Sequence, residues 1–145
     1  MGFEFSETMA GTAAWDSEPG TRSPFRFDIT VHADSTRDHL ATGLASIQGT
    51  VYAPPKTRAG PAEGTIEIRV FGKKIIRYQL GFLADDGERY ELVGQKDISY
   101  LHPFRSFTVL PAEILDGQRR RVATCETRFD LRRHGWSLVR SLRRA

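Results

Sequence analysis

The sequence predicts an all-β protein built from about eight antiparallel strands. Apolar residues alternate with polar ones in several separate segments, which is the period of a strand with one buried face. The links between these segments are short and contain Gly, Pro, Asp or Ser, as tight turns require. Apolar residues at helical spacing occur mainly near the C-terminal end, so helices are expected to be few. Such a chain folds into a barrel or a sandwich.

The best-defined element is a β-hairpin between Lys74 and Tyr100. Its turn is the acidic segment Ala84–Glu88, because Asp-Gly suits the positive backbone angles of a tight hairpin. One charged residue lies on the otherwise apolar face of this hairpin, and that residue is Lys96. The whole face comprises Ile76, Tyr78, Leu80, Phe82, Tyr90, Leu92, Gly94, Lys96, Ile98 and Tyr100.

Two strands are expected at the start of the chain, Phe3–Met9 and Phe25–His32, since both alternate strictly. Residues 11–22 between them are interpreted as a loop or a bent continuation of the first strand, with Trp15 at an edge of the core. Residues 34–40 have helix-starting chemistry, with room for only a turn or two.

A third strand is expected over residues 41–52. Its glycines, Gly43 and Gly49, would permit the bending that a closed barrel requires. Residues 53–64 are rich in turn-forming residues and are interpreted as a loop. A fourth strand follows at 66–70, directly before the hairpin.

Two more strands are expected after the hairpin. The seventh covers residues 104–110 and stops at Pro111, because proline cannot donate to a strand ladder. The turn 116–118 leads to an eighth strand over residues 123–131.

Eight strands are the number at which a closed barrel is filled by its own side chains or holds one small ligand. We therefore expect a lipocalin-like antiparallel β-barrel over residues 1–132, with a β-sandwich as the alternative. Residues 133–145 are expected to form a basic tail with a short helix.

The composition fits one soluble domain. The chain has 145 residues, of which 27% are charged and 39% hydrophobic, which differs from disordered and membrane proteins. No apolar run approaches the roughly 20 residues of a membrane-spanning helix. The single Cys125 cannot form an internal disulfide, and the N-terminus lacks the features of a secretory signal. These observations favour a cytoplasmic location.

Positive charge is concentrated at the C-terminal end. Residues 119–145 carry nine arginines against Glu126 and Asp130, a net +7, so the first 118 residues carry −4 of the overall +3. The tail is interpreted as a solvated helix packed on one barrel end, or as a surface for anionic membranes or a partner protein. Exposed aromatics interleaved with basic residues are missing elsewhere, which disfavours nucleic acid. The candidate contact residues are Arg133, Trp136, Arg140 and Arg144.

Two charged residues are expected on apolar strand faces, Glu7 and Lys96. A charge inside an apolar environment is costly unless it is paired or neutralised by a shift in its pKa. If both face one interior, mutual pairing is the least costly arrangement, and the pair could orient the polar end of an apolar ligand. The alternatives are a purely structural ion pair, or a bulge that turns one of them toward solvent.

Three tyrosines share the predicted face of Lys96 and are candidate ligand contacts, namely Tyr78, Tyr90 and Tyr100. Buried tyrosines are more often core residues than catalytic ones, although a Tyr-Lys pair could polarise a carbonyl. The sequence has no glycine-rich nucleotide loop and no nucleophile elbow, so no cofactor is expected. The histidines lack metal-ligand spacing, and one cysteine does not make a structural zinc site.

Two segments resemble a module that accompanies bacterial flavin oxidoreductases of the glucose-methanol-choline type, particularly cholesterol-oxidase-like proteins. One is Phe5–Gly11, FSETMAG, and the other is Tyr78–Lys96, which ends in Tyr-x-Leu-x-Gly-x-Lys. The intervening strands fit in order and spacing, so the resemblance extends over most of residues 3–131. It implies an accessory domain beside a redox or lipid-processing enzyme, since this chain has no flavin-binding region.

Three functions follow as hypotheses. The first is binding of a hydrophobic small molecule, lipid or sterol-like, with Glu7 and Lys96 at its polar end. The second is a cyclase or isomerase of the same architecture, in which Lys96 or Glu7 acts as general acid or base. The third is a docking module that contacts a protein or membrane through the basic tail. Cavity volume, the pH dependence of any rate, and deletion of residues 133–145 distinguish the three.

Overall fold

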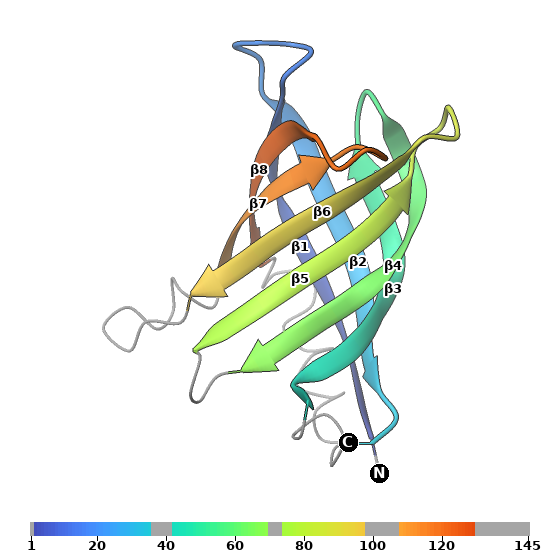
Figure 1. Cartoon of the computed structure of the whole chain (residues 1–145), viewed down its shortest axis with the longest axis vertical. Helices are drawn as coiled ribbons and strands as arrows, with labels where there is room; N and C mark the ends of the chain where they lie inside the picture. The colour runs from blue at the N-terminus through green and yellow to red at the C-terminus, as the bar shows by residue number, and fades with distance from the viewer. Residues whose placement is uncertain (1, 36–41, 70–73, 98–107, 130–145) are drawn as a thin grey trace.

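The computed structural model is a single sheet of eight antiparallel strands closed into a barrel (Figure 1). Each strand pairs with its neighbours in sequence, and β8 returns to pair with β1. The structure describes residues 2–35, 42–69, 74–97 and 108–129. The strands are β1 (Phe3–Trp15), β2 (Ser23–Ala33), β3 (Leu44–Ala53), β4 (Thr57–Arg69), β5 (Ile75–Leu83), β6 (Arg89–Asp97), β7 (Val109–Leu115) and β8 (Arg121–Phe129).

Closure of the sheet confirms the predicted all-β barrel of eight antiparallel strands and excludes the sandwich. The predicted C-terminal helix and the basic tail, residues 133–145, lie outside the described residues. Most of residues 34–40, where a helical turn was expected, also lie outside the described residues.

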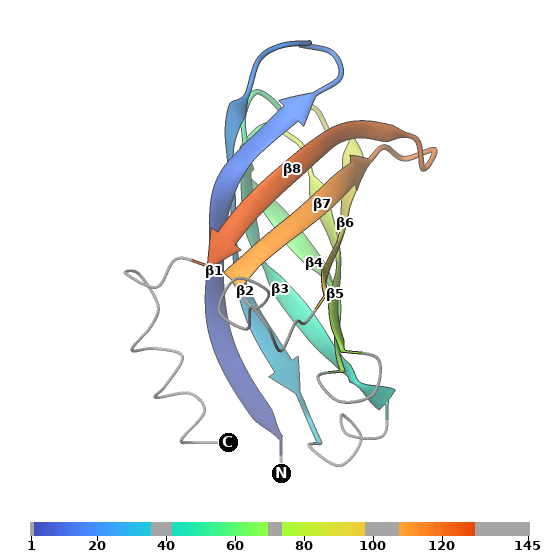
Figure 2. The same ribbon diagram turned by 90° about the vertical axis from the view of Figure 1, so that its left-hand side faces the viewer.

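The strands are staggered around the barrel, and β1 shows this most clearly (Figure 2). Residues Phe3–Ala13 of β1 pair with β2, whereas Met9–Trp15 pair with β8. Four hairpins face one end of the barrel, here called the upper end; they are residues 16–22, 54–56, 84–88 and 116–120. The opposite, lower end contains the N-terminus (Figure 1).

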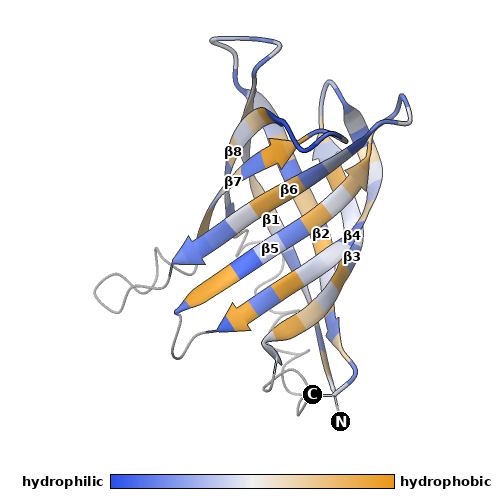
Figure 3. Ribbon diagram, viewed as in Figure 1, coloured by the Kyte–Doolittle hydropathy of each residue, from blue (hydrophilic) through white to orange (hydrophobic). Residues whose placement is uncertain are grey.

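Side chains on the apolar face of each strand point into the barrel interior. In β2, Phe25, Phe27, Ile29 and Val31 are buried and alternate with polar residues that face outward. The same alternation gives the strands their banded hydropathy (Figure 3). Because the side-chain period of a strand is two, this pattern decides which residues face inward.

The predicted β5–β6 hairpin is confirmed. The Ala84 amide donates to the Glu88 carbonyl at 2.8 Å, which closes the turn. Gly87 has a φ of 88°, a left-handed conformation that favours glycine.

Of the two small-residue segments, Gly11–Trp15 follows the alternative of a continued first strand, whereas residues 57–64 lie in a segment expected to be a loop. Gly11–Trp15 continues β1 and pairs with β8, and Thr57–Gly64 forms the first part of β4. Their small residues and proline resemble turn sequences, but pairing with the adjacent strands places them in the sheet. Trp15, the last residue of β1, is buried, with 3% of its surface exposed.

The expected boundaries of the seventh strand were wrong at its C-terminal end. Pro111 lies inside β7, opposite Glu126 of β8, and the strand continues to Leu115. On its other side, the β6–β7 ladder has only four residue pairs and ends at Gly94 and Ala112, next to Pro111. A proline has no amide hydrogen to extend such a ladder, so it is tolerated where pairing ends.

The two glycines expected to bend the third strand differ in role. A Cβ at Gly49 would lie 1.9 Å from the carbonyl oxygen of Asp28, so only glycine permits this close approach of β2 and β3. Gly43 precedes β3 and has a φ of 76°, which places it in the turn that leads into the strand.

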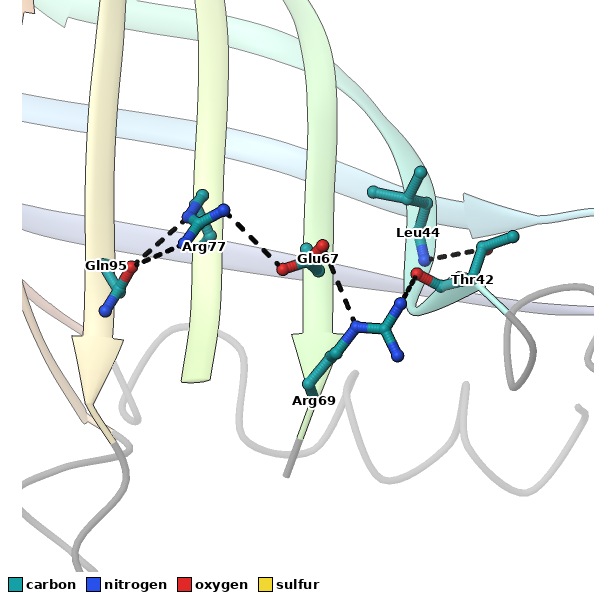
Figure 4. A network of polar contacts seen from close by, with 6 residues as sticks. All are labelled: Thr42, Leu44, Glu67, Arg69, Arg77 and Gln95. Atoms are coloured by element: carbon teal, nitrogen blue, oxygen red, sulfur yellow. Dashed lines mark hydrogen bonds and ion pairs between the residues drawn. The ribbon is translucent and has the colours of Figure 1, made fainter. Parts of the chain in front are cut away.

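Polar side chains form a network of contacts on the outer surface of the barrel, across the lower parts of β4, β5 and β6 (Figure 4). Arg77 lies between its two cross-strand partners: its guanidinium donates to Gln95 Oε1 at 3.2 Å and lies 3.8 Å from Glu67. Arg69 lies 3.9 Å from Glu67 and donates to the carbonyl of Thr42. Such partly exposed pairs contribute at most about 1 kcal/mol each, so their main effect is on register.

Candidate functional site

A carboxylate and a phenol meet inside the barrel. Glu7 of β1 and Tyr78 of β5 both face inward and are 7% and 1% exposed. The Tyr78 hydroxyl donates to Glu7 Oε1 at 2.6 Å. The two residues are on non-adjacent strands, so this hydrogen bond crosses the interior instead of following the wall.

Lys96 of β6 faces the same interior and is 3% exposed. Its ammonium nitrogen lies 5.2 Å from the centre of the Tyr78 ring, a cation–π contact. Glu7 and Lys96 therefore both face the interior; among the described residues, Glu7 bonds to Tyr78 and forms no ion pair with Lys96 within 4.0 Å. The Tyr78 side chain contacts both, so it links the two charged groups.

The environment shifts the ionisation of two of these groups. Burial lowers the pKa of Lys96, and the attraction of Glu7 opposes that shift without cancelling it. Burial raises the pKa of Tyr78 well above its ordinary value, and the neighbouring Glu7 charge and its hydrogen bond raise it further. Tyr78 is therefore a neutral donor, while Lys96 loses its proton more readily than a surface lysine.

Thr127 of β8 adds a fourth polar side chain to the interior, and the sequence analysis did not single it out. It is 1% exposed, and its hydroxyl oxygen has no hydrogen-bond partner among the described residues. It lies opposite Leu110 of β7, the next strand toward Lys96. The alternation along the strand predicts that Thr127 faces inward, but the sequence does not indicate that its hydroxyl lacks a hydrogen-bond partner. We call Glu7, Tyr78, Lys96 and Thr127 the polar cluster.

Tyr90 does not join this cluster, although it shares a strand face with Lys96. Six residues of extended strand separate them by about 20 Å. Tyr90 instead packs near the upper end, edge-on to Trp15 at 5.9 Å and stacked on Phe82 at 5.7 Å. The Lys56 ammonium lies over both Trp15 and Tyr90, 5.6 and 5.8 Å from the ring centres.

The remaining candidate residues cannot be placed. Tyr100 and the four tail residues Arg133, Trp136, Arg140 and Arg144 lie outside the described residues. Their suggested roles in binding a ligand, membrane or partner stay predictions.

The Cys125 thiol is expected to make stability fall in alkaline solution. Cys125 is 6% exposed and faces the interior, and burial raises its pKa from 9.0 to about 12. Between these values the unfolded chain loses the thiol proton and the folded chain keeps it. The free energy of unfolding therefore falls by about 1.4 kcal/mol per pH unit above pH 9.

Urea unfolding at pH 8 and pH 10 measures this effect, with Cys125→Ala as the comparison. The loss of stability between the two pH values should be smaller in the variant by about 1.4 kcal/mol, one pH unit above the unfolded pKa. Equal losses in both proteins would contradict the assignment.

The described residues give no sign of two other kinds of site. They contain no cluster of three or more His, Cys, Asp and Glu side chains able to hold a metal ion. No helix in the described ranges has the length and hydropathy needed to cross a bilayer.

Comparison with known proteins assigns no family. No protein-family model matches the chain, and no curated protein shows a significant sequence match to it.

Proposed function

We propose that this chain is a lipocalin-like barrel that binds a hydrophobic small molecule, lipid or sterol-like, with the polar end of the ligand at the polar cluster. One observation carries the proposal. Thr127 Oγ1 is buried and has no hydrogen-bond partner among the described residues, and Lys96, which is also buried, faces the same interior with its ammonium over the Tyr78 ring.

Buried polar atoms without partners are costly, and most are satisfied in folded proteins. A ligand carbonyl or hydroxyl between β6 and β8 would accept a hydrogen bond from Lys96 and another from Thr127. The Glu7–Tyr78 pair would remain intact beside it, because their hydrogen bond satisfies the Tyr78 hydroxyl.

The apolar part of the ligand would lie toward the lower end. There the inward-facing side chains are apolar but only partly buried, as at Phe5, Ile68 and Phe129. Near the upper end the interior is occupied by the aromatic residues Trp15, Phe82 and Tyr90. A hydrophobic molecule that enters from the lower end would meet these apolar side chains together with Lys96, which lies one residue from the lower end of β6.

Binding is tested with 1-aminoanthracene, an uncharged fluorescent probe, and with 1-decanol as its competitor. We expect saturable binding of one probe per chain and displacement by decanol. Phe5→Asp adds a charge to the inward face of β1 and should weaken probe binding at least tenfold. Absence of saturable binding by the wild-type protein would overturn the proposal.

Ser6→Asp is the matched control for this experiment. Ser6 is adjacent to Phe5 but faces outward, where its hydroxyl lies 3.4 Å from that of Thr30. The same charge at this position should change probe affinity less than twofold. Equal losses in both variants would indicate a general effect on folding, which circular dichroism would detect.

The polar cluster also favours the second hypothesis, a cyclase or isomerase. Lys96 has a lowered pKa and Glu7 is bonded to a phenol, so the cluster contains groups able to donate and accept protons. The third hypothesis, docking through the basic tail, concerns residues outside the described ranges.

The partner and location are likewise proposals. The resemblance of Phe5–Gly11 and Tyr78–Lys96 to the flavin-oxidoreductase module supports a role as accessory to a redox or lipid-processing enzyme. The single unpaired Cys125 supports a cytoplasmic location.

A further inference from the structure

Lys96 combines features of a nucleophilic amine. It is a buried lysine on the inward face of β6, with Ile76 beside it on β5 and its ammonium over the ring of Tyr78. We propose that Lys96 captures an apolar aldehyde or ketone as an imine inside the barrel. This inference rests on the proposed function, because the carbonyl compound must first bind in the interior.

Imine formation needs a neutral amine and a route for protons. The Lys96 nitrogen attacks the carbonyl carbon, a C–N bond forms, and the resulting carbinolamine loses its oxygen as water. The two hydrogens of the amine leave with that oxygen, so amine plus carbonyl gives imine plus water. Glu7 and its partner Tyr78 are the titratable groups that face Lys96 among the described residues, and they would pass these protons.

Burial favours this chemistry at Lys96 over the other lysines. A desolvated lysine has a lowered pKa and is more nucleophilic at neutral pH, and burial lowers the pKa of Lys96 in this way. The Lys56 ammonium lies near the upper end of the barrel, over the rings of Trp15 and Tyr90, and is remote from the polar cluster. Lys74 is exposed at the lower end of β5.

The apolar walls select the class of carbonyl compound. Ile76 lies beside Lys96 on β5 and the buried residues of the interior are mostly apolar, so an aldehyde or ketone with an aliphatic or ring-like body is favoured over a sugar. Exclusion of water would also slow hydrolysis of the imine.

The experiment uses decanal and the reductant sodium cyanoborohydride on the full chain at neutral pH. Reduction converts the imine to a stable secondary amine, which intact mass and peptide mapping locate. The chain has four lysines and one α-amino group, and peptide mapping distinguishes all five sites. We expect one decyl group per chain, located on Lys96.

Two variants make the result specific. Lys96→Met should reduce decyl labelling at least tenfold, and Lys96→Arg, which keeps the charge, should do the same. Lys56→Arg should label as the wild type does. Equal labelling of all lysines, or unchanged labelling in both folded Lys96 variants, would overturn the inference.

Decanol separates this inference from the proposed function, because it has the same chain but cannot form an imine. Displacement of the probe by decanol without labelling of Lys96 would overturn imine formation and support binding. Labelling of Lys96 by decanal in a protein that binds no probe would support the reactive lysine and overturn the binding of larger apolar ligands.

Discussion

Replacing Gly49 with alanine is expected to lower the free energy of unfolding by about 3 kcal/mol or more. The added Cβ would lie 1.9 Å from the carbonyl oxygen of Asp28 and 2.9 Å from the Cα of Ile29. Both are backbone atoms of β2, so the strand itself would have to move. In a closed barrel that movement disturbs pairing on both sides of β2.

Gly81→Ala is the matched control, because Gly81 also lies in a strand. The nearest atom to a Cβ at that position is the carbonyl oxygen of Glu63 at 3.6 Å, which is ordinary van der Waals contact. Urea unfolding should show a large loss for Gly49→Ala, and a change within about 0.5 kcal/mol for Gly81→Ala. Similar stabilities of the two variants would mean that β2 and β3 do not approach so closely.

Replacing Glu7 with glutamine is expected to destabilise the protein by about 3 kcal/mol. The glutamine amide oxygen can still accept the hydrogen bond from the Tyr78 hydroxyl, so the loss of stability measures the effect of removing the charge. Glu7 is the group whose attraction raises the pKa of Lys96 against the effect of burial. Without it, the buried ammonium has only the ring of Tyr78 near it among the described residues.

A double-mutant cycle with Lys96→Met tests this coupling. When Lys96 is absent, Glu7→Gln no longer leaves an uncompensated cation, so its cost should fall by more than half. Urea unfolding of the four proteins gives the coupling energy. An identical cost of Glu7→Gln in both backgrounds would show that the two charges do not interact.

Alternation along the chain was sufficient to predict the barrel strands that are rich in large apolar residues. It was insufficient where the inward-facing residues are small, as in Gly11–Trp15 and Thr57–Gly64. There the strand conformation depends on pairing with β8, β3 and β5, which local composition does not encode. Pro111 was expected to end the seventh strand for a related reason. Whether a strand accepts a proline depends on where its pairing with a neighbour ends, and the β6–β7 ladder ends next to Pro111.

Alternation along the strands also predicted part of the candidate site. A period of two places Glu7 and Lys96 on the same strand faces as their apolar neighbours, which are the inward faces. It says nothing of depth, so Tyr90 was grouped with Lys96 although the two lie about 20 Å apart along β6. The contact of Glu7 with Tyr78 depends on the stagger of the closed sheet, which is a property of the whole barrel.

The pairing of β1 with β8 has a consequence for the order of folding. Every other pair of strands joins neighbours in sequence, so a nascent chain can form an open sheet strand by strand. The segment Met9–Trp15 pairs with Ala123–Phe129, and it keeps an unpaired edge until that last strand has been synthesised. Until then the interior is open on one side and Glu7 remains hydrated. Pairing of β8 with β1 therefore turns an open sheet into a closed barrel.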